Sequence, residues 1–180
     1  GQDPVKQHRA ITATVGYLSQ RFSLYGDLSI DENIAFFAEI HGLSDYRGRR
    51  DRLLEMTQLT PFRNRLADQL SGGMKQKLAL AGALIHEPRL LILDEPLTGL
   101  DAAAARSVKD ILLEQVAAGG TVILTTHILE VAERIAQRIG IIRAGRLVAE
   151  GTLDQLRALA GRSADGTLED VFLQLTGEPA

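Results

Sequence analysis

Two short apolar runs in the second half of the chain constrain its fold more than any other feature. They are "RLLILDEP" (89–96) and "TVILTTH" (121–127), both dominated by Leu, Ile and Val. Strands of this kind are expected where both faces of a sheet are covered. An alanine-rich segment with helical periodicity spans 102–118, and Gly119-Gly120 is expected to end it. This alternation predicts an α/β fold with a parallel sheet and crossover helices.

The first half of the chain adds one strand and a helical lobe. The β-branched run "ITATVGYLSQ" predicts a strand over 11–20. Residues 21–87 are mostly helical in pattern and are expected to form a side subdomain. Its first expected helix begins at Ser29, with Glu32 as capping partner and with Ile30, Ile34, Phe37 and Ile40 at helical spacing. A second helix is expected over about 46–58, and a third from Ser71 to Pro88.

The last third is expected to hold a helix to about Gln137, a hairpin and a helical tail. The hairpin covers 138–151 and turns at Ala144-Gly145, and the tail covers 152–180. The final helix is expected to start at Thr167, capped together with Asp170, after the linker-like "GRSADG" (161–166). We interpret the 180 residues as one partial domain.

Composition excludes several classes of protein. The chain has 45% hydrophobic and 24% charged residues, an ordinary globular balance, and no cysteine for disulfides or thiolate metal sites. A net charge of −3 argues against a nucleic-acid binder that works by bulk charge. The arginine cluster over 47–52 is interpreted as a solvated helix face. No run approaches the roughly 20 apolar residues of a membrane span.

The strongest local signal for chemistry is Asp94-Glu95, at the carboxyl end of the first buried run. Ligands of open α/β sheets gather at this edge, and a carboxylate there suits a phosphate-bound Mg²⁺. Glu95 could polarise a water for attack on a phosphoryl group. By itself the pair is equally compatible with a strand that ends in an acidic turn.

Two further residues are expected at the same edge. His127 follows the second buried run, where it could contact a terminal phosphate oxygen. Gln20 ends the predicted first strand and could ligate Mg²⁺ through its carbonyl oxygen or contact a water. Alone, each is more often an ordinary loop or solvated side chain.

The stretch "LSGGMKQ" (70–76) places two glycines at a predicted helix start. Ser71 is a good N-cap, and the amides of Gly72 and Gly73 lie at the positive end of the helix. Without side chains, these residues let an anion approach the amides closely. A plain capped helix with a flexible start is the alternative, but tandem glycines after serine favour anion binding.

Five motifs together resemble the nucleotide-binding domain of ABC-type ATPases, with its P-loop NTPase-like α/β fold. They are "VGYLSQ", "LSGGMKQ", "LLILDEP", "LTGLD" and "TTH", in this order. The resemblance implies that Gln20 is the Q-loop glutamine and that Ser71, Gly72, Gly73 and Met74 form the signature motif. It also implies that Asp94 is the Walker B aspartate and Glu95 the catalytic base. Asp101 would be the D-loop aspartate and His127 the switch histidine. Met74 stands where many members have glutamine.

The resemblance also implies cofactors and partners. ATP and Mg²⁺ would lie between two ATP-binding domains arranged head to tail, and a transmembrane permease would bind the helical subdomain through "RFSLYGDLS" (21–29). The ending "GTLEDVFLQLTGE" (166–178) is similar to that of ABC-2-type exporters of drugs, lipids or polysaccharides. The expected location is the cytoplasmic face of the plasma membrane, as a peripheral protein that binds no nucleic acid.

One motif of the family is missing. The phosphate cradle G-x-x-x-x-G-K-[ST] does not occur, and no Gly-Lys pair exists in the chain. A fragment, a truncated version and a degenerate domain are the three explanations. We favour a fragment, since the downstream motifs keep their catalytic residues, and we expect the isolated chain to be inactive. The alternatives are a soluble ABC protein of translation or DNA repair and a non-enzymatic nucleotide-sensing module.

Overall fold

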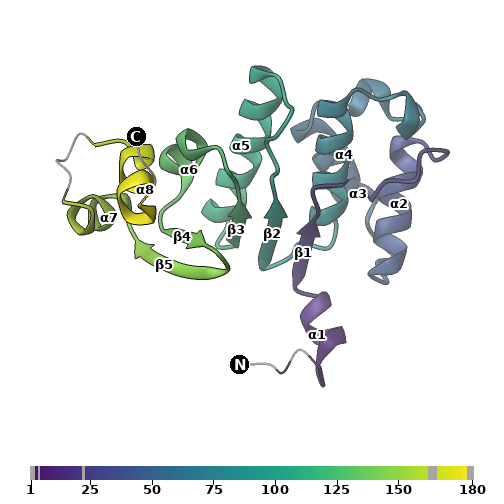
Figure 1. The fold of residues 1–180 in the computed structure, drawn as a ribbon. Coiled ribbons are helices and arrows are strands. Elements are labelled where there is room, and N and C mark those ends of the chain that lie inside the picture. Colours follow the sequence, from purple (N-terminus) through teal and green to yellow (C-terminus); the bar gives the residue numbers. More distant parts are fainter. Residues whose placement is uncertain (1–2, 4, 22, 162–165, 178–180) are drawn as a thin grey trace. The chain divides into compact units, whose positions relative to one another are not determined.

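The computed structural model describes residues 3, 5–21, 23–161 and 166–177 (Figure 1). The chain divides into two compact units, Gly1–Thr125 and Thr126–Ala180, and each is described by itself. Most of the linker predicted at 161–166 lies outside the described residues. The assignment of all 180 residues to one domain stays a prediction.

A three-stranded parallel sheet lies at the centre of the first unit (Figure 1). Its order is β1 (Val15–Leu18), β2 (Leu90–Asp94), β3 (Thr121–Thr125), with Leu18 opposite Leu93 and Asp94 opposite Thr125. The crossover from β2 to β3 is the helix α5 (Ala102–Ala117). The predicted parallel α/β fold is therefore confirmed.

The strand predicted over 11–20 is wrong at its start. Ile11 and Thr12 belong to a short helix, α1 (His8–Thr12), in which the Ile11 amide donates to the Gln7 carbonyl oxygen. The Thr14 amide then donates to the Ile11 carbonyl oxygen, so the chain turns before β1 begins. β-Branched residues favour strands mainly where a neighbouring strand pairs with them, and among the described strands the pairing of β1 with β2 starts only at Val15.

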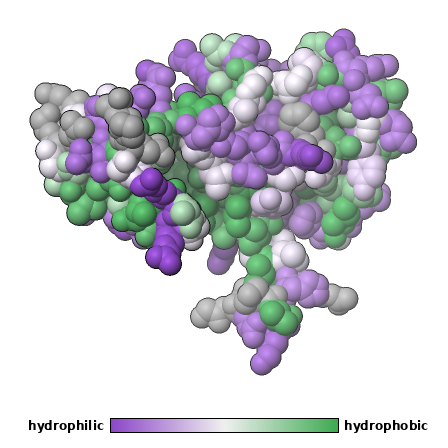
Figure 2. Space-filling view, in the orientation of Figure 1, coloured by the Kyte–Doolittle hydropathy of each residue, from purple (hydrophilic) through white to green (hydrophobic). Residues whose placement is uncertain are grey.

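The two faces of this sheet differ. Leu91 and Leu93 are buried on the face that carries α4 (Gly72–Leu84) and α5. Gly16 on β1 is also buried there, and a Cβ on it would lie 2.5 Å from the Ala83 carbonyl oxygen. On the other face, Tyr17 is 62% exposed and Ile123 52% exposed. Hydrophobic residues thus reach the surface over the strands, as the green areas of Figure 2 show.

Helices fill the chain between β1 and β2. They are α2 (Ile30–Ile40), α3 (Arg47–Met56), the 3₁₀ turns η1 (Thr60–Phe62) and η2 (Ala67–Gln69), and α4. The predicted capping box is present, because the Ser29 side chain accepts from the Glu32 amide and Glu32 bonds back to the Ser29 amide. The helix from Ser71 ends at Leu84, four residues before the proline expected to stop it.

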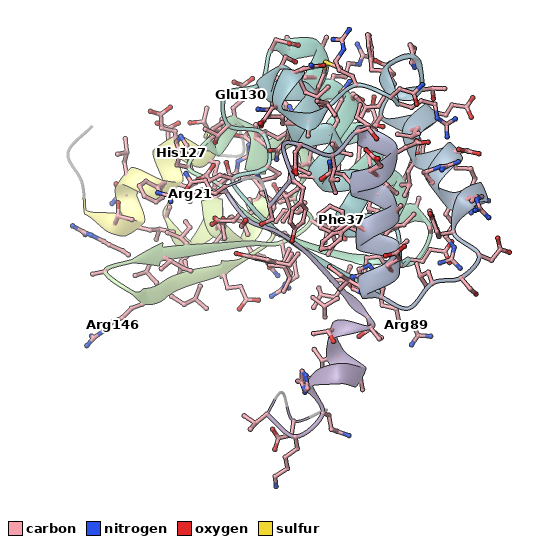
Figure 3. The ribbon with its side chains drawn as sticks, turned by 90° about the vertical axis from the view of Figure 1, so that its right-hand side faces the viewer. Arg21, Phe37, Arg89, His127, Glu130 and Arg146 are labelled. Carbon is pink, nitrogen blue, oxygen red and sulfur yellow. The ribbon has the colours of Figure 1, made fainter. Side chains whose placement is uncertain are left out.

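The apolar residues at helical spacing on α2 are buried at its start and exposed at its end. Ile30 and Ile34 are fully buried, whereas Ile40 is 62% exposed. Phe37 packs on α4, where a Cβ on Gly82 would lie 2.5 Å from its ring (Figure 3). Ile40 is the last residue of the helix and lies beyond this contact, so helical spacing alone does not decide its burial.

Asn33 fixes the loop that leads into α2. Its side chain is fully buried; its Oδ1 accepts from the Tyr25 amide, and its Nδ2 donates to the carbonyl oxygens of Tyr25, Leu28 and Ser29. A buried amide with all these partners is a strong constraint on the backbone. The loop after β1 is therefore held in one conformation from residue 25 onward.

The sequence predicted that the arginines of 47–52 form a solvated helix face, but two of them make ion pairs with other elements. Arg50 contacts Asp31 on α2 at 3.3 Å, and Arg49 contacts Glu87 at 3.1 Å. Arg49 also donates to the Ile85 carbonyl oxygen. These guanidinium groups join α3 to α2 and to the end of α4.

The second unit is built on the predicted hairpin. β4 (Ile139–Arg143) and β5 (Arg146–Gly151) pair antiparallel, and Ala144 and Gly145 both take positive φ at the turn. The helices are α6 (Leu129–Ile135), α7 (Leu153–Leu159) and α8 (Leu168–Thr176), the last capped by Thr167 and Asp170 as predicted.

The core of this unit joins the hairpin to the tail. Its buried residues are Ile139, Ile141, Ala149, Leu156, Leu168 and Val171. Arg157 contacts Glu133 at 3.3 Å, and Glu133 also accepts from the Leu168 amide. Within the described residues of the whole chain, no helix is long and apolar enough to cross a bilayer.

Candidate nucleotide-handling site

The carboxyl end of β2 places two carboxylates in different settings. Asp94 is the last residue of the strand, and the Thr125 hydroxyl on β3 donates to its Oδ1 at 2.5 Å. This contact follows from the register, because Thr125 is the residue opposite Asp94. Asp94 is thereby oriented by the neighbouring strand while its second oxygen stays available for a ligand.

Glu95 leaves the strand in an unusual backbone conformation. Its φ is +51°, which is rare for a residue with a side chain and concentrates at functional sites. Its amide donates to the Thr125 carbonyl oxygen at 3.1 Å, continuing the β2–β3 ladder by one residue. The Thr98 hydroxyl donates to Glu95 Oε2 at 3.0 Å, so the carboxylate is oriented from within its own loop. Both carboxylates are half-buried.

The loop 95–101 ends at a helix cap. Asp101 is the N-cap of α5, and its Oδ1 accepts from the Ala104 amide at 2.8 Å. The helix that the sequence predicted over 102–118 begins at Ala102, which confirms its start. In the described structure one carboxylate oxygen of Asp101 is used for this cap, and its assignment to a D-loop role stays a prediction.

The start of α4 is as the sequence predicted. Ser71 is the N-cap, and its Oγ accepts from the Met74 amide at 3.3 Å. The Lys75 amide donates to the Ser71 carbonyl oxygen. Among the described residues, no acceptor contacts the amides of Gly72 and Gly73, and Ser71 and Gly72 are exposed. These two amides and the Ser71 hydroxyl are free to bind an anion.

Gly73 packs against the first turn of α5. A Cβ on Gly73 would lie 3.2 Å from the Ala104 Cβ, whereas a Cβ on Gly72 would meet nothing within 4 Å. The two glycines therefore differ: Gly73 allows close packing of two helix starts, and Gly72 keeps the exposed side bare. The sequence did not show that the two glycines have different surroundings.

Gln20 lies two residues beyond β1, at the same edge of the sheet as Asp94. It is exposed and lines a cavity of about 430 Å³. The other lining residues are Arg21, Leu24, Gly26, Ala67, Asp68 and Lys75. The structure thus brings Gln20 to a cavity shared with Lys75 of α4, and no hydrogen bond joins it to Asp94.

His127 belongs to the second unit, of which it is the second residue. It is exposed, and the following backbone is turned by the Thr126 hydroxyl, which accepts from the Ile128 amide at 3.0 Å. β3 ends at Thr125, two residues before the predicted end of this strand. Its predicted role at the phosphate stays a prediction.

The donor chemistry suits Mg²⁺ held jointly with phosphate. The described residues contain no cluster of three or more His, Asp or Glu side chains that would form a complete metal cage. Mg²⁺ in phosphate sites needs only one or two protein oxygens, because phosphate and water supply the rest. Asp94, with one oxygen already oriented by Thr125, fits this requirement, and Gln20 is the second candidate from the sequence.

Sequence reasoning missed three residues of this region. Thr125 orients Asp94, Thr98 orients Glu95, and Gln76 on α4 donates from its Nε2 to the Pro96 carbonyl oxygen at 2.8 Å. Thr125 could have been found from strand register, since parallel pairing places it opposite Asp94. No local signal identifies the partner of Gln76, because the two residues come together only through packing.

Comparisons with known proteins agree on one family. A family model described as ABC transporter matches residues 1–98. The chain is 40% identical over 180 residues to the daunorubicin resistance ATP-binding protein DrrA3 of Streptomyces coeruleorubidus, covering 99% of this chain and 56% of that protein. It is 42% identical over 147 residues to the Nod factor export ATP-binding protein I of Rhizobium leguminosarum bv. viciae, covering 81% and 47%. The chain thus spans about half the length of these curated relatives.

Solved structures give the same result. The structure of an ATP-binding subunit of an ABC transporter superposes with a TM-score of 0.89 at 32% identity, covering 98% of this chain and 74% of that one. A dimeric post-hydrolysis state of the ATP-binding cassette MJ0796, bound to ADP and Pi, superposes with a TM-score of 0.74 at 28% identity, covering 84% and 68%.

Proposed function

Because the chain belongs to the ABC transporter family of ATP-binding proteins, we propose that it is part of the ATP-hydrolysing subunit of an exporter. The observation that carries this proposal is the end of β2. There Asp94 and Glu95 are separately oriented, by Thr125 and by Thr98, at the edge of a parallel sheet where ligands bind.

In this proposal each residue has one task. Asp94 supports Mg²⁺, which would neutralise charge on the phosphates. Glu95 accepts a proton from the attacking water, and Gln20 and His127 contact the γ-phosphate or that water. Ser71, Gly72 and Gly73, beside Met74, offer a hydroxyl and two amides to the nucleotide of a second ATP-binding domain, and Asp101 belongs to the interface between the two domains.

The phosphate cradle is proposed to come from residues outside these 180. The sequence contains no G-x-x-x-x-G-K-[ST] motif, so the lysine and backbone amides that hold the β- and γ-phosphates are not in it. The isolated 180-residue chain should accordingly show no Mg-ATPase activity.

The proposed partners follow from the surface beside Gln20. The segment 21–29, held from residue 25 onward by Asn33, is proposed to bind the transmembrane permease. Arg21 and Leu24 of this segment line the cavity with Gln20, which would connect the permease contact to the nucleotide edge. The protein would then act at the cytoplasmic face of the membrane. Its cargo is proposed to be a drug, lipid or polysaccharide; one relative is named for daunorubicin resistance and another for Nod factor export.

The test is Glu95→Gln in the full-length protein. Loss of the general base should lower the turnover number at least about 100-fold, while ATP-dependent dimerisation, followed by size-exclusion chromatography, stays intact. Glu55→Gln, at an exposed site on α3, is the matched control and should hydrolyse ATP like the wild type. Near-normal phosphate release by Glu95→Gln would refute the role of Glu95.

A further inference from the structure

The buried side chain of Gln76 connects the start of α4 to the loop that follows Glu95. Gln76 is 5% exposed, and its Nε2 donates to the Pro96 carbonyl oxygen at 2.8 Å. It lies on α4, five residues after the N-cap Ser71. Pro96 is itself buried and immediately follows Glu95. One side chain therefore joins α4 to the backbone of the residue that follows the proposed base, Glu95.

This contact acts on a backbone that needs external support. Glu95 has a φ of +51°, a strained conformation for a residue with a side chain. Such a conformation persists only where the surroundings fix it. The Thr125 carbonyl oxygen fixes the Glu95 amide on one side, and Gln76 fixes the Pro96 carbonyl on the other. The two contacts together hold the backbone before and after Glu95.

The far end of the same loop is braced by the same helix. A Cβ on Gly73 would lie 3.2 Å from the Ala104 Cβ and 3.8 Å from the Leu100 Cδ2. Leu97, inside the loop, is buried, and its carbonyl oxygen accepts from the Leu100 amide. The first two turns of α4 thus contact the loop 95–101 at its beginning, through Gln76, and at its end, through Gly73.

From these contacts we propose that Gln76 is a positioning residue for Glu95, which ties the aim of this carboxylate to the helix that carries Ser71, Gly72 and Gly73. This inference rests on the proposed function. Its consequence is that a displacement of α4, when its N-terminus binds a nucleotide, moves the Pro96 carbonyl and with it the base of the chain's own site. Gln76 does not contact the nucleotide itself.

The experiment uses Gln76→Met in the full-length protein, with Gln115→Met as a matched control. Methionine keeps the length of the side chain and removes its donor. Gln115 makes the same kind of contact at the other end of β2, where its Nε2 donates to the Pro88 carbonyl oxygen at 2.8 Å. Both variants lose one hydrogen bond to a proline carbonyl, but only Gln76→Met disturbs the loop after Glu95.

We expect Gln76→Met to lower kcat for Mg-ATP hydrolysis about five- to tenfold, the effect of one lost hydrogen bond, with KM changed less than twofold. Gln115→Met should keep kcat within twofold of the wild type. A kcat for Gln76→Met within twofold of the wild type, or an equal loss in Gln115→Met, would overturn the inference.

A second variant gives a readout that lost stability would not change. The carboxylate of Gln76→Glu cannot donate to the Pro96 carbonyl oxygen, but its protonated form can, and burial raises the pKa of such a carboxyl. We expect the ratio of its kcat to that of the wild type to rise as the pH falls from about 8.5 to 6. The ratio of Gln115→Glu to wild type should not rise in this way. A flat ratio for Gln76→Glu would refute the positioning role even if Gln76→Met fails to fold.

The same assays separate this inference from the proposed function. Hydrolysis by the wild type and its loss in Glu95→Gln together support the proposed function. If they hold and the Gln76 variants behave like the wild type, only the positioning role is wrong. If the wild type does not hydrolyse ATP, or Glu95→Gln keeps its turnover, the proposed function fails and the inference with it.

Discussion

The two ends of β2 are built alike but use their polar groups differently. At each end a glutamine amide donates to a proline carbonyl oxygen, Gln115 to Pro88 at the amino end and Gln76 to Pro96 at the carboxyl end. At the carboxyl end Asp94 accepts from Thr125 through Oδ1 and keeps its second oxygen for a ligand. At the amino end the polar groups are used to hold the elements together.

Histidines show this difference most clearly. His86 contacts the Val15 carbonyl oxygen through Nε2 at 3.0 Å and stacks on His41 with ring centroids 3.6 Å apart. Burial lowers the pKa of His86, helped by the positive charge that His41 would carry, and burial lowers the pKa of His41. The lowered pKa values favour the neutral form of both rings. The comparison teaches that the carboxyl end should control activity and the amino end stability.

Asp94→Asn gives the largest effect expected at the carboxyl end. Removing the charge that would support Mg²⁺ should lower kcat in the full-length protein at least about 100-fold, or about 2.7 kcal/mol. The free energy of unfolding, measured in urea, should change by less than about 1 kcal/mol, because Asp94 is only half-buried. A large loss of stability with normal turnover would break the comparison.

Gly16→Ala gives the largest effect expected toward the amino end. The new Cβ would lie 2.5 Å from the Ala83 carbonyl oxygen and 2.9 Å from Pro88. Overpacking against backbone should cost about 2 kcal/mol in urea unfolding. Gly48→Ala on α3, where a Cβ meets nothing within 4 Å, is the control and should stabilise the protein by about 0.5–1 kcal/mol. Equal changes in the free energy of unfolding for Gly16→Ala and Gly48→Ala would contradict the close packing of Gly16 against α4.

Thr125→Val tests the orientation of Asp94. Valine keeps the shape of threonine and removes the hydroxyl that donates to Asp94 Oδ1. We expect kcat to fall about tenfold, equivalent to about 1.4 kcal/mol, and the urea midpoint to stay close to that of the wild type because Thr125 is exposed. Thr121→Val, at the exposed start of the same strand, is the matched control and should leave kcat unchanged.

The histidine stack should give the smallest effect, and it depends on pH. The pKa values of His41 and His86 in the folded protein lie below the ordinary histidine value of about 6.5. The unfolded chain therefore binds more protons than the folded chain as the pH falls. Stability should therefore be constant above about pH 7 and decrease as the pH falls below about 6.5. His41→Phe keeps a stacked ring without a titrating group, and should flatten this decrease in urea unfolding at pH 7.5, 6.5 and 5.5. An unchanged slope would show that the stack does not titrate in this range.

Much of the fold was predictable because it depends on neighbours in sequence. Ser29, Ser71 and Thr167 cap helices through residues three positions away, so their motifs were sufficient. The two buried runs became neighbouring parallel strands, since continuous apolar runs joined by a helix fit few other arrangements. Helix and strand ends were less accurate: α4 is four residues shorter than predicted, and β3 two residues shorter.

In the candidate site, too, some features were predictable from the sequence and others were not. Residue types and motif order identified Asp94, Glu95 and the start of α4, because the chemistry of a phosphate site requires those groups. Their orientation was not predictable. Thr125 lies 31 residues from Asp94 and Gln76 lies 20 residues from Pro96, so these contacts depend on strand register and helix packing.

Residue types and their order are enough to predict which residues carry charge, cap helices and form strands, since these are local properties of the chain. The exposure of Ile40, the stacking of His41 on His86 and the contact of Gln76 with the backbone beside Glu95 depend on the folded structure. Each of these depends on how α2 and α4 pack on one another and on the sheet. Such packing is set by the shapes of many side chains together, and a pattern of residue types does not encode it one position at a time.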